Sequence, residues 1–495
     1  MNKTVYPVRS QVVNEIFSQE NRFDKILIVP LDHAKTNHTV QFCYATGEHL
    51  FKKAMTVYND PRGLKYLIDR LRKTCENKQI EQKNVVICCE DPPQYMLNFI
   101  HGLQSAGYKF VSVNATEASR YRSNNRASSD SLDLDGIAQA LINRRAMDIR
   151  PVDELYTNLK TATRSRRRLV MNETALKNRI HKCVDILFPG FLNEKNTGIT
   201  PFTPVCLWLM EKNFSVIKLR RIAVKTLLEG LKRHRISKPE EVFVKLKKCS
   251  NEVLIPPPEV VSYYQKSLAA KVKLLRCMQE TSHFEENEAA RFLVQSPGFY
   301  ILSIPGIGIK YASHIMAEYG DPAFWKSVDK MASFGGIVSR QKQTGGREKR
   351  DPSVQYLPKD CNKILKDYLL QAAQHTGKTL HPFRKIMPEY DGSHTLQQHF
   401  EHFENNECKS KLRNAKLLLK IILCLVKEQR FYEPEKDWFE NMTIDEHIRF
   451  HSHALDNIKH KLNGYDLSGI PAENNFFLKE EQTLHDLIEF RKNNH

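Results

Sequence analysis

Three aspartates lie within six residues in the stretch SSDSLDLDGIA, directly ahead of an apolar helical pattern. One acid is enough to cap a helix, because its side chain accepts from a free backbone N–H and the helix dipole favours negative charge. Asp130 and Asp133 are three positions apart and share one helix face, whereas Asp135 points elsewhere. The pair exceeds what capping requires and is a candidate for chemistry.

Two further acids follow apolar runs typical of buried strands. Asp32 ends KILIVPLD and Glu90 ends NVVICCE, so each is expected at a sheet edge, where all four acids can converge. Their repulsion then requires a divalent cation, and oxygen ligands suit Mg²⁺ or Mn²⁺. Two such ions about 4 Å apart promote attack on a phosphodiester. The alternative for each acid by itself is a cap or a solvated strand end.

The overall charge predicts a polyanionic partner. Lys and Arg number 75 against 57 Asp and Glu in 495 residues, a formal charge of +18 that is spread along the chain, which favours nucleic acid. The sequence has no secretory h-region and no apolar window of about 18 residues, so we expect a cytoplasmic protein that does not span a membrane. The eleven cysteines include no CxxC pair, and we expect neither disulfides nor a zinc site.

The elements that must position the acids are short apolar runs alternating with helical patterns. They predict an α/β domain with a mixed sheet over residues 24–150. Pro30 cannot donate to a central ladder, so its strand must bulge or lose a hydrogen bond there. The adjacent Cys88 and Cys89 sit in an apolar run and are expected in the core.

Long amphipathic helices are predicted over residues 151–295, interrupted by a helical insertion at 191–255. Two apolar stripes could pair as an antiparallel or an intermolecular coiled coil. The RSRRR segment on the first helix is expected to form an exposed basic cluster that contacts nucleic acid. This cluster comprises Arg164, Arg166, Arg167 and Arg168.

A mainly α-helical domain is predicted over residues 296–435, followed by a helical tail at 436–495. Its turn Gly306-Ile307-Gly308 resembles a helix-hairpin-helix, in which glycines let the N–H groups at the start of the second helix approach a phosphate, with Lys310 nearby. A glycine-rich, basic segment, FGGIVSRQKQTGGREKRD, follows.

Several blocks of the sequence resemble, in order and spacing, the insertion-sequence family 110 transposases. These blocks are VPLDHAKTNHTV, VICCEDPPQY, AGYKFVSVNATEASRYR, SSDSLDLDGIA, SRRRLVMNETALKNRI, ILSIPGIGIKYASHIMAEYGD and FGGIVSRQKQTGG. The family includes the Piv-type invertases, and the resemblance spans about residues 24–435. It implies a RuvC/RNase H-like DEDD domain, whose four metal ligands would be Asp32, Glu90, Asp130 and Asp133, and a C-terminal transposase domain.

The resemblance also implies a function: a site-specific DNA recombinase that moves its element through a circular intermediate, guided by a bridge RNA. Such an enzyme would act in a prokaryotic cytoplasm and associate with the nucleoid during recombination. The coiled-coil pattern and the need to hold two duplexes predict a homodimer or homotetramer, and the resemblance implies active sites shared between protomers.

The family's serine nucleophile, part of a Ser-Gly pair, corresponds here to Thr344, followed by Gly345. A threonine has the same attacking oxygen, but its β-methyl hinders approach, so activation by a base or metal matters more. Ser339 is the nearest alternative hydroxyl, and a glycine-rich loop without chemistry is the other interpretation. Basic residues of this loop are expected on DNA phosphates under either interpretation; they include Arg340, Lys342 and Arg347.

Two other functions remain open from the sequence. In a Holliday-junction-type hydrolase, the acids would activate water and Thr344 would not attack DNA. In a non-catalytic RNA- or DNA-binding scaffold, only the basic surfaces would be used. Acids at all four ligand positions count against the scaffold, and trapping of a protein–DNA adduct would separate the three.

Overall fold

The fold is described from a computed structural model, in which the chain divides into two compact units, Met1–Asp153 and Glu154–His495. The structure describes residues 10–92, 94–122, 130–149, 154–325, 327–338, 340–341, 355–356, 361–387, 390–402, 407–434 and 442–493. The three regions expected after residue 150 therefore belong to one unit.

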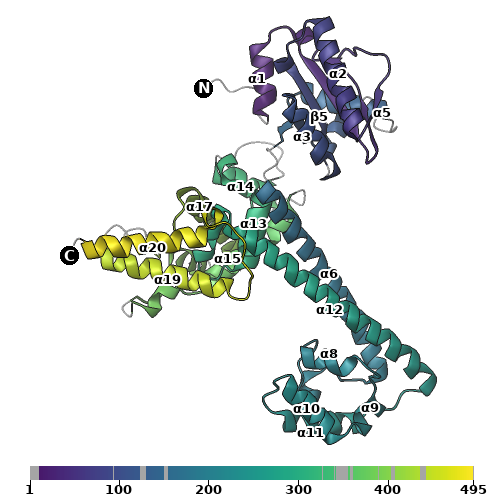
Figure 1. The fold of residues 1–495 in the computed structure, drawn as a ribbon, viewed down its shortest axis with the longest axis vertical. Helices are drawn as coiled ribbons and strands as arrows, with labels where there is room; N and C mark the ends of the chain where they lie inside the picture. Colours follow the sequence, from purple (N-terminus) through teal and green to yellow (C-terminus); the bar gives the residue numbers. More distant parts are fainter. Residues whose placement is uncertain are drawn as a thin grey trace. The chain divides into compact units, whose positions relative to one another are not determined.

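The first unit is built on a mixed sheet, as predicted (Figure 1). Its strands are β1 (Leu27–His33), β2 (Asn37–Val40), β3 (Cys43–Tyr44), β4 (Met55–Tyr58), β5 (Val85–Glu90), β6 (Lys109–Val113) and β7 (Met147–Asp148). They lie in the order β4-β2-β1-β5-β6-β7, with β3 also paired to β1. The pairs β1–β5 and β5–β6 are parallel, and the other pairs are antiparallel.

Helices cover both faces of this sheet, so its central strands are apolar on both sides. Odd-numbered residues of β1 and β5 pack in one core cluster beside α2 (Pro61–Lys78) and α3 (Leu97–Ser105). Even-numbered residues pack in a second cluster beside α1 (Gln11–Gln19) and α5 (Asp130–Ile142). Cys88 and Cys89 are fully buried on opposite faces, which confirms their place in the core. The short α4 (Ala115–Arg120) lies against α5.

Pro30 interrupts the antiparallel ladder, as expected for a residue without an N–H. The β2 and β3 segments follow one register against β1, with Leu31 opposite Val40 and Ile28 opposite Cys43. The ladder is broken between them, opposite Pro30, although Pro30 O still accepts from Gln41 N at 3.2 Å. On its other edge β1 remains paired with β5, so the strand keeps its direction up to Asp32.

Two long helices dominate the second unit and lie side by side (Figure 1). They are α6 (Glu154–Leu187) and α12 (Pro258–Val294). The first turns of α6 share a core cluster with the last turns of α12, and Leu176 near the other end packs with Leu268, so the pair is antiparallel within one chain. This settles the pairing of these two stripes in favour of the intramolecular alternative.

Shorter helices complete each end of this pair. The end near Leu187 and Pro258 carries a compact insertion, comprising α7 (Glu194–Thr197), α8 (Pro204–Met210), α9 (Val216–Arg221), α10 (Val224–Arg233) and α11 (Pro239–Asn251). The other end carries the C-terminal helices, α13 (Ile309–Tyr319), α14 (Val328–Phe334), α15 (Lys363–Lys378), α16 (Thr395–Glu401), α17 (Glu407–Glu428), α19 (Ile444–Leu462) and α20 (Phe476–Asn493), with a short β8 (Arg340–Gln341) and β9 (Gln355–Tyr356) hairpin. A mainly helical C-terminal region is thereby confirmed.

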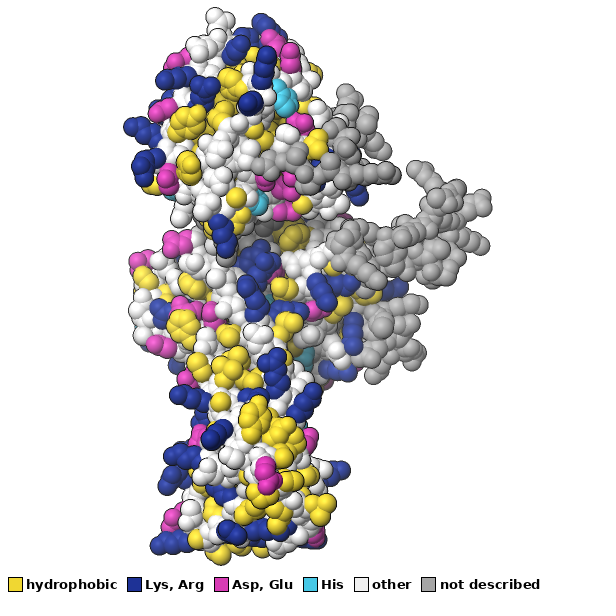
Figure 2. All heavy atoms as spheres, turned by 90° about the vertical axis from the view of Figure 1, so that its right-hand side faces the viewer, with side chains coloured by type: hydrophobic (Ala, Val, Ile, Leu, Met, Phe, Trp, Pro, Cys, Tyr) yellow, Lys and Arg dark blue, Asp and Glu magenta, His cyan; other side chains and the backbone are white. Residues whose placement is uncertain are grey.

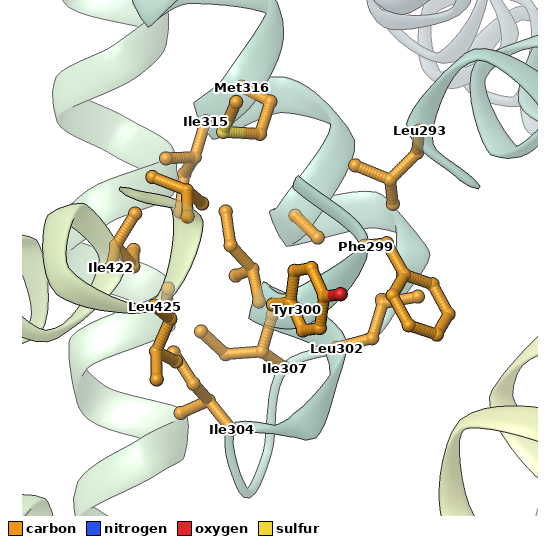
Figure 3. Packing of buried hydrophobic residues seen from close by; sticks show 14 of the residues in the cluster. Leu293, Phe299, Tyr300, Leu302, Ile304, Ile307, Ile315, Met316, Ile422 and Leu425 are labelled. Carbon is orange, nitrogen blue, oxygen red and sulfur yellow. The ribbon is translucent and has the colours of Figure 1, made fainter. Parts of the chain in front are cut away.

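The C-terminal core encloses the segment before α13. Ile304 and Ile307 pack in one cluster with Ile422 and Leu425 of α17 (Figure 3). The tail is part of the same core, since Lys461 of α19 donates to the carbonyls of Leu302 and Ile304. Of the described helices, none is long and apolar enough to cross a membrane.

Candidate active site

Two of the four predicted acids lie together at one end of the sheet. In the parallel pairing of β1 and β5, Leu31 is opposite Cys89, so Asp32 and Glu90 follow at matching positions. Both belong to the even-numbered face that α5 covers. Parallel strands place such residues at the same carboxyl edge, which is where ligands bind in open α/β sheets.

Asp133 completes a three-acid group from the α5 side. It lies in the first turn of α5, which packs on β1 and β5. Burial raises the pKa of the Glu90 carboxyl, and Arg122 counteracts part of this shift. The negative charges of Asp133 and Asp32 raise the Glu90 pKa further, so these three carboxylates influence one another electrostatically. Asp130 begins α5, but its side chain lies outside the described residues.

Arg122 lies between two of these acids, a contact that the sequence analysis missed. Its Nε is 2.9 Å from Asp133 Oδ1, and its Nη2 is 3.7 Å from Glu90 Oε1. The side chains are each about four-fifths buried, with 20–24% exposed. Neither approach is aligned as a hydrogen bond, so Arg122 compensates charge without satisfying these oxygens. The only sequence signal was the position of Arg122 in the block AGYKFVSVNATEASRYR.

The oxygens that remain are suited to a divalent cation. Glu90 Oε1 and Asp133 Oδ1 are buried, and within the described part of the chain neither accepts a hydrogen bond. Buried carboxylate oxygens without donors are costly unless a cation compensates them. As placed, no three His, Cys, Asp or Glu side chains among the described residues form a ready-made metal site. The donor set nevertheless fits Mg²⁺ or Mn²⁺, with Asp130 as the fourth candidate ligand.

Asp135 is separated from this group, as the helix spacing predicted. Its Oδ1 lies 3.0 Å from Nε2 of His49. Helix α5 therefore directs one acid of the cluster toward Glu90 and another toward a histidine of the β3–β4 connection.

His33, which the sequence analysis did not single out, holds the ends of β1 and β5 together by hydrogen bonds. His33, directly after Asp32, places its Nε2 3.0 Å from the Glu90 carbonyl and its Nδ1 3.0 Å from the Tyr95 hydroxyl. Asn59 in the loop before α2 donates to the Tyr95 carbonyl at 3.4 Å. These bonds tie β1, β5 and the β4–α2 loop together at the edge that carries the acids.

Three of the four arginines of the basic cluster on α6 form ion pairs, and the expectation of exposed side chains is wrong for Arg166 and Arg167, which are 15% and 25% exposed. Arg164 forms two bonds to Glu318 at 2.8 and 2.9 Å, Arg166 approaches Glu286 to 2.6 Å, and Arg167 lies 2.8 Å from Asp367. Arg168 is exposed, and within the described residues it has no ion-pair partner. On the face drawn in Figure 2, Lys and Arg side chains are spread widely over the surface.

Arg164 forms this ion pair because the Glu318 carboxylate is buried. The Glu318 side chain is 1% exposed. Burial acts to raise the pKa of Glu318, but Arg164, Lys160 and Asn362 together hold that pKa below its usual value. A carboxylate buried to this degree requires such partners, and they fix α6, α13 and the start of α15 against one another.

The glycine turn before α13 differs from a hairpin of two α-helices, because its first arm is the 3₁₀ helix η4 (Pro297–Ser303). Gly306 has φ 76°, and a Cβ there would lie 2.8 Å from Thr379 Oγ1, so this glycine serves close packing. A Cβ at Gly308 would meet nothing within 4 Å. The Gly308 backbone at the start of α13 is therefore approachable, and Lys310 beside it is exposed.

The predicted nucleophile loop falls outside the described residues. This applies to Ser339, Lys342, Thr344, Gly345 and Arg347. Arg340 is placed by its backbone in β8, opposite Tyr356 of β9.

Two protein-family models match the chain. A DEDD model of the IS110 type, described as transposase, matches residues 29–189 and includes all four predicted acids. A model described as "Transposase IS116/IS110/IS902 family" matches residues 300–386, which include the glycine turn and Thr344. No curated protein matches the chain. The insertion at the end of the long helix pair and the tail helices α19 and α20 lie outside both matches.

Proposed function

Because the chain belongs to the IS110 family of transposases, enzymes that cleave and rejoin DNA, we propose that it is the site-specific recombinase of an insertion sequence. The observation that carries the proposal is the group of acids at the carboxyl edge of the sheet. Asp32 and Glu90 occupy matching positions on adjacent parallel strands, and Asp133 reaches the same Arg122 as Glu90. We assign this unit to the RuvC/RNase H-like fold on the same arrangement.

In this proposal Asp32, Glu90, Asp130 and Asp133 hold Mg²⁺ or Mn²⁺. The metal would polarise the reacting phosphodiester and stabilise the charge that develops on its oxygens. Partial burial of Glu90 and Asp133 limits the access of water to these two acids. His33 fixes the Glu90 backbone, so that the ends of β1 and β5 keep a constant separation.

The proposed strand cleavage uses Thr344. Its hydroxyl gives up a proton as Oγ bonds to phosphorus, the bond from phosphorus to the departing DNA oxygen breaks, and that oxygen takes up a proton, which leaves a DNA hydroxyl and a threonine phosphodiester. Attack by another DNA hydroxyl reverses the step and rejoins a new pair of ends. Energy of the phosphodiester is conserved, so no cofactor other than the metal is needed.

We further propose that a bridge RNA selects the DNA and that the enzyme acts as a homodimer or homotetramer in the cytoplasm, at the nucleoid during recombination. The net charge of +18 supports a nucleic-acid partner. Phosphate contacts are assigned to the Gly308 backbone and to basic side chains that include Arg168, Lys310, Arg340, Lys342 and Arg347. Arg164, Arg166 and Arg167 are assigned a structural role because of their ion pairs.

Trapping of a covalent adduct tests this function. The full chain, its guide RNA and a labelled element end with Mg²⁺ should give a denaturation-resistant protein–DNA adduct, and peptide mapping should find DNA on Thr344. Cleavage without an adduct would replace the proposal with a junction-type hydrolase. Binding without cleavage would replace it with a scaffold.

A further inference from the structure

We propose that the hollow between the edge strand β4 and the first turns of α2 binds an unpaired nucleotide of the enzyme's nucleic-acid partner, by base stacking and a phosphate contact. The inference takes from the proposed function only that the partner is a nucleic acid. The hollow has a volume of about 530 Å³, which is within the range of small-molecule sites. Its walls are formed by Thr56, Val57, Tyr58, Asp60, Arg62, Gly63 and Tyr66.

Two exposed tyrosines line this hollow and make it suitable for a planar ligand. Tyr58 is 63% exposed at the end of β4, and Tyr66 is 50% exposed on α2. Large aromatic side chains are usually buried, and an exposed pair in one hollow forms a platform on which bases of any sequence can stack. Both tyrosines line the hollow and both are exposed, so each can offer its ring to a planar ligand without any rearrangement of the core.

Arg62 adds a positive charge on the same side. It is four residues before Tyr66 and shares its face of α2. Arg62 is exposed, and within the described part of the chain no carboxylate pairs with it. Asp60 also lines the hollow, but its Oδ1 accepts from Gly63 N at 2.6 Å as the cap of α2. A guanidinium beside two aromatic rings matches a nucleotide, which joins a base to a phosphate.

The floor of the hollow is fixed by a close backbone approach. A Cβ at Gly63 would lie 2.0 Å from the Tyr58 carbonyl oxygen, so only glycine lets the β4–α2 loop fold back on the helix. Asn59 holds the same loop by donating to the Lys35 carbonyl at 3.1 Å. The two tyrosines are therefore carried on a rigid support.

The position of the hollow connects it with the acids. Asp32 pairs with Thr39 of β2, and Thr39 pairs with Thr56 of β4, so Thr56 lies in the same cross-strand row as Asp32. Two strand spacings of about 4.8 Å separate them by roughly 10 Å. Strand β4 is parallel to β1, and its carboxyl end opens at the edge that carries Asp32 and Glu90. The acids lie on the face that α5 covers and α2 covers the other face, so a nucleotide bound here would lie near the same strand ends, on the α2 side of the sheet.

The test uses the full chain with EDTA present, so that binding is measured without cleavage. Fluorescence anisotropy is recorded with labelled poly-dT, labelled poly-U and a blunt DNA duplex. Tyr58→Ala and Tyr66→Ala should each weaken single-strand binding about tenfold, as expected for the loss of one stacked base. Tyr58→Phe and Tyr66→Phe keep the ring and should bind like the wild type.

Two further variants locate the effect. Tyr263→Ala removes a tyrosine of similar exposure, 68%, from α12 and should leave binding unchanged. Arg62→Ala should lower the slope of log affinity against log salt by about 0.7, the value for one single-strand phosphate contact. Circular dichroism should show the wild-type fold in every variant, since each replaced side chain is exposed.

The outcome on the two single strands identifies the source of the nucleotide: a loss with poly-dT only indicates DNA, a loss with poly-U only indicates RNA, and a loss with both indicates a site that does not read the sugar. Unchanged single-strand affinity in both alanine variants would overturn the inference. An equal loss of duplex affinity would also overturn it, because stacked bases in a duplex are not available. None of these readouts depends on an adduct, so a failed trapping experiment leaves this test intact.

Discussion

Arg164→Ala tests whether the α6 arginines are structural, because it leaves Glu318 buried without its main partner. Removal of one member of a buried ion pair typically costs about 3–5 kcal/mol. In this protein Asn362 remains 2.6 Å from Glu318, Lys160 remains 3.7 Å away, and the Arg164 side chain is itself 40% exposed. We therefore expect a loss of about 2 kcal/mol in the stability of the C-terminal unit.

Hydrogen exchange of the α6 and α13 amides measures this loss locally, which matters because a chain of two units need not unfold in one step. Arg168→Ala is the matched control, since Arg168 is exposed and has no ion-pair partner within the described residues. It should change stability by less than about 0.5 kcal/mol. Equal effects of the two substitutions on stability would refute the structural assignment.

The pH dependence of the same loss has a defined sign. The pKa of Glu318 is lowered in the folded protein, despite its burial, by Arg164, Lys160 and Asn362. Its ionised form therefore contributes stability above the usual pKa of a glutamate, and this contribution disappears as the pH falls through the lowered value. The difference between the wild type and Arg164→Ala should shrink at acid pH, and a constant difference would contradict the role of Glu318.

Four other predictions concern the acids, the nucleophile and the basic surface. Asp133→Asn should abolish DNA cleavage in a nicking assay, because a metal ligand is lost. Its nucleic-acid affinity should stay near that of the wild type, because no basic residue is lost. Asp135→Asn is the control and should remain active, and normal cleavage by Asp133→Asn would refute the proposed metal site. Thr344→Ala should eliminate the protein–DNA adduct on denaturing gels, whereas Thr344→Ser should retain it because the attacking oxygen is kept. An adduct formed by Thr344→Ala would show that another residue is the nucleophile. Arg122→Gln should tighten Mn²⁺ binding measured by electron paramagnetic resonance, since it removes a positive charge within 4 Å of Glu90 and Asp133; weaker binding would show that Arg122 organises the site instead. Arg168→Ala should lower the slope of log affinity against log salt concentration by about 0.7 to 0.9. An unchanged slope would show that Arg168 does not contact a phosphate.

The sequence by itself determined the N-terminal fold class and the position of its acids. Apolar runs bounded by acids predicted the strands that became β1 and β5, and parallel neighbours place such acids at one edge. Helix spacing predicted that Asp135 points away from the face shared by Asp130 and Asp133, and Asp133 and Asp135 do contact different partners. These features follow from local periodicity, which a single sequence carries in full.

The pairing of the two long helices could not be predicted from local periodicity alone. Apolar stripes predicted two long helices, but the same stripes fit pairing within one chain and pairing between chains. The structure pairs α6 with α12 in one chain, where the insertion closes one end and the C-terminal core the other. The choice depends on the packing of residues far apart in the chain, such as Leu176 with Leu268, which no short sequence window contains.

Only the tertiary structure decided which charges are free and which hollows exist. The RSRRR segment looks solvent-exposed in sequence, yet Arg164 meets a carboxylate 154 positions away and Arg167 meets one 200 positions away. Arg122 reaches Glu90 and Asp133 through a turn whose direction has no periodic signal. The tyrosines of the β4–α2 hollow line one site only because the chain turns between β4 and α2, where Gly63 approaches the Tyr58 carbonyl. Long-range charge pairing and surface shape are properties of the packed chain, because each depends on atoms brought together by folding and not on neighbours in sequence.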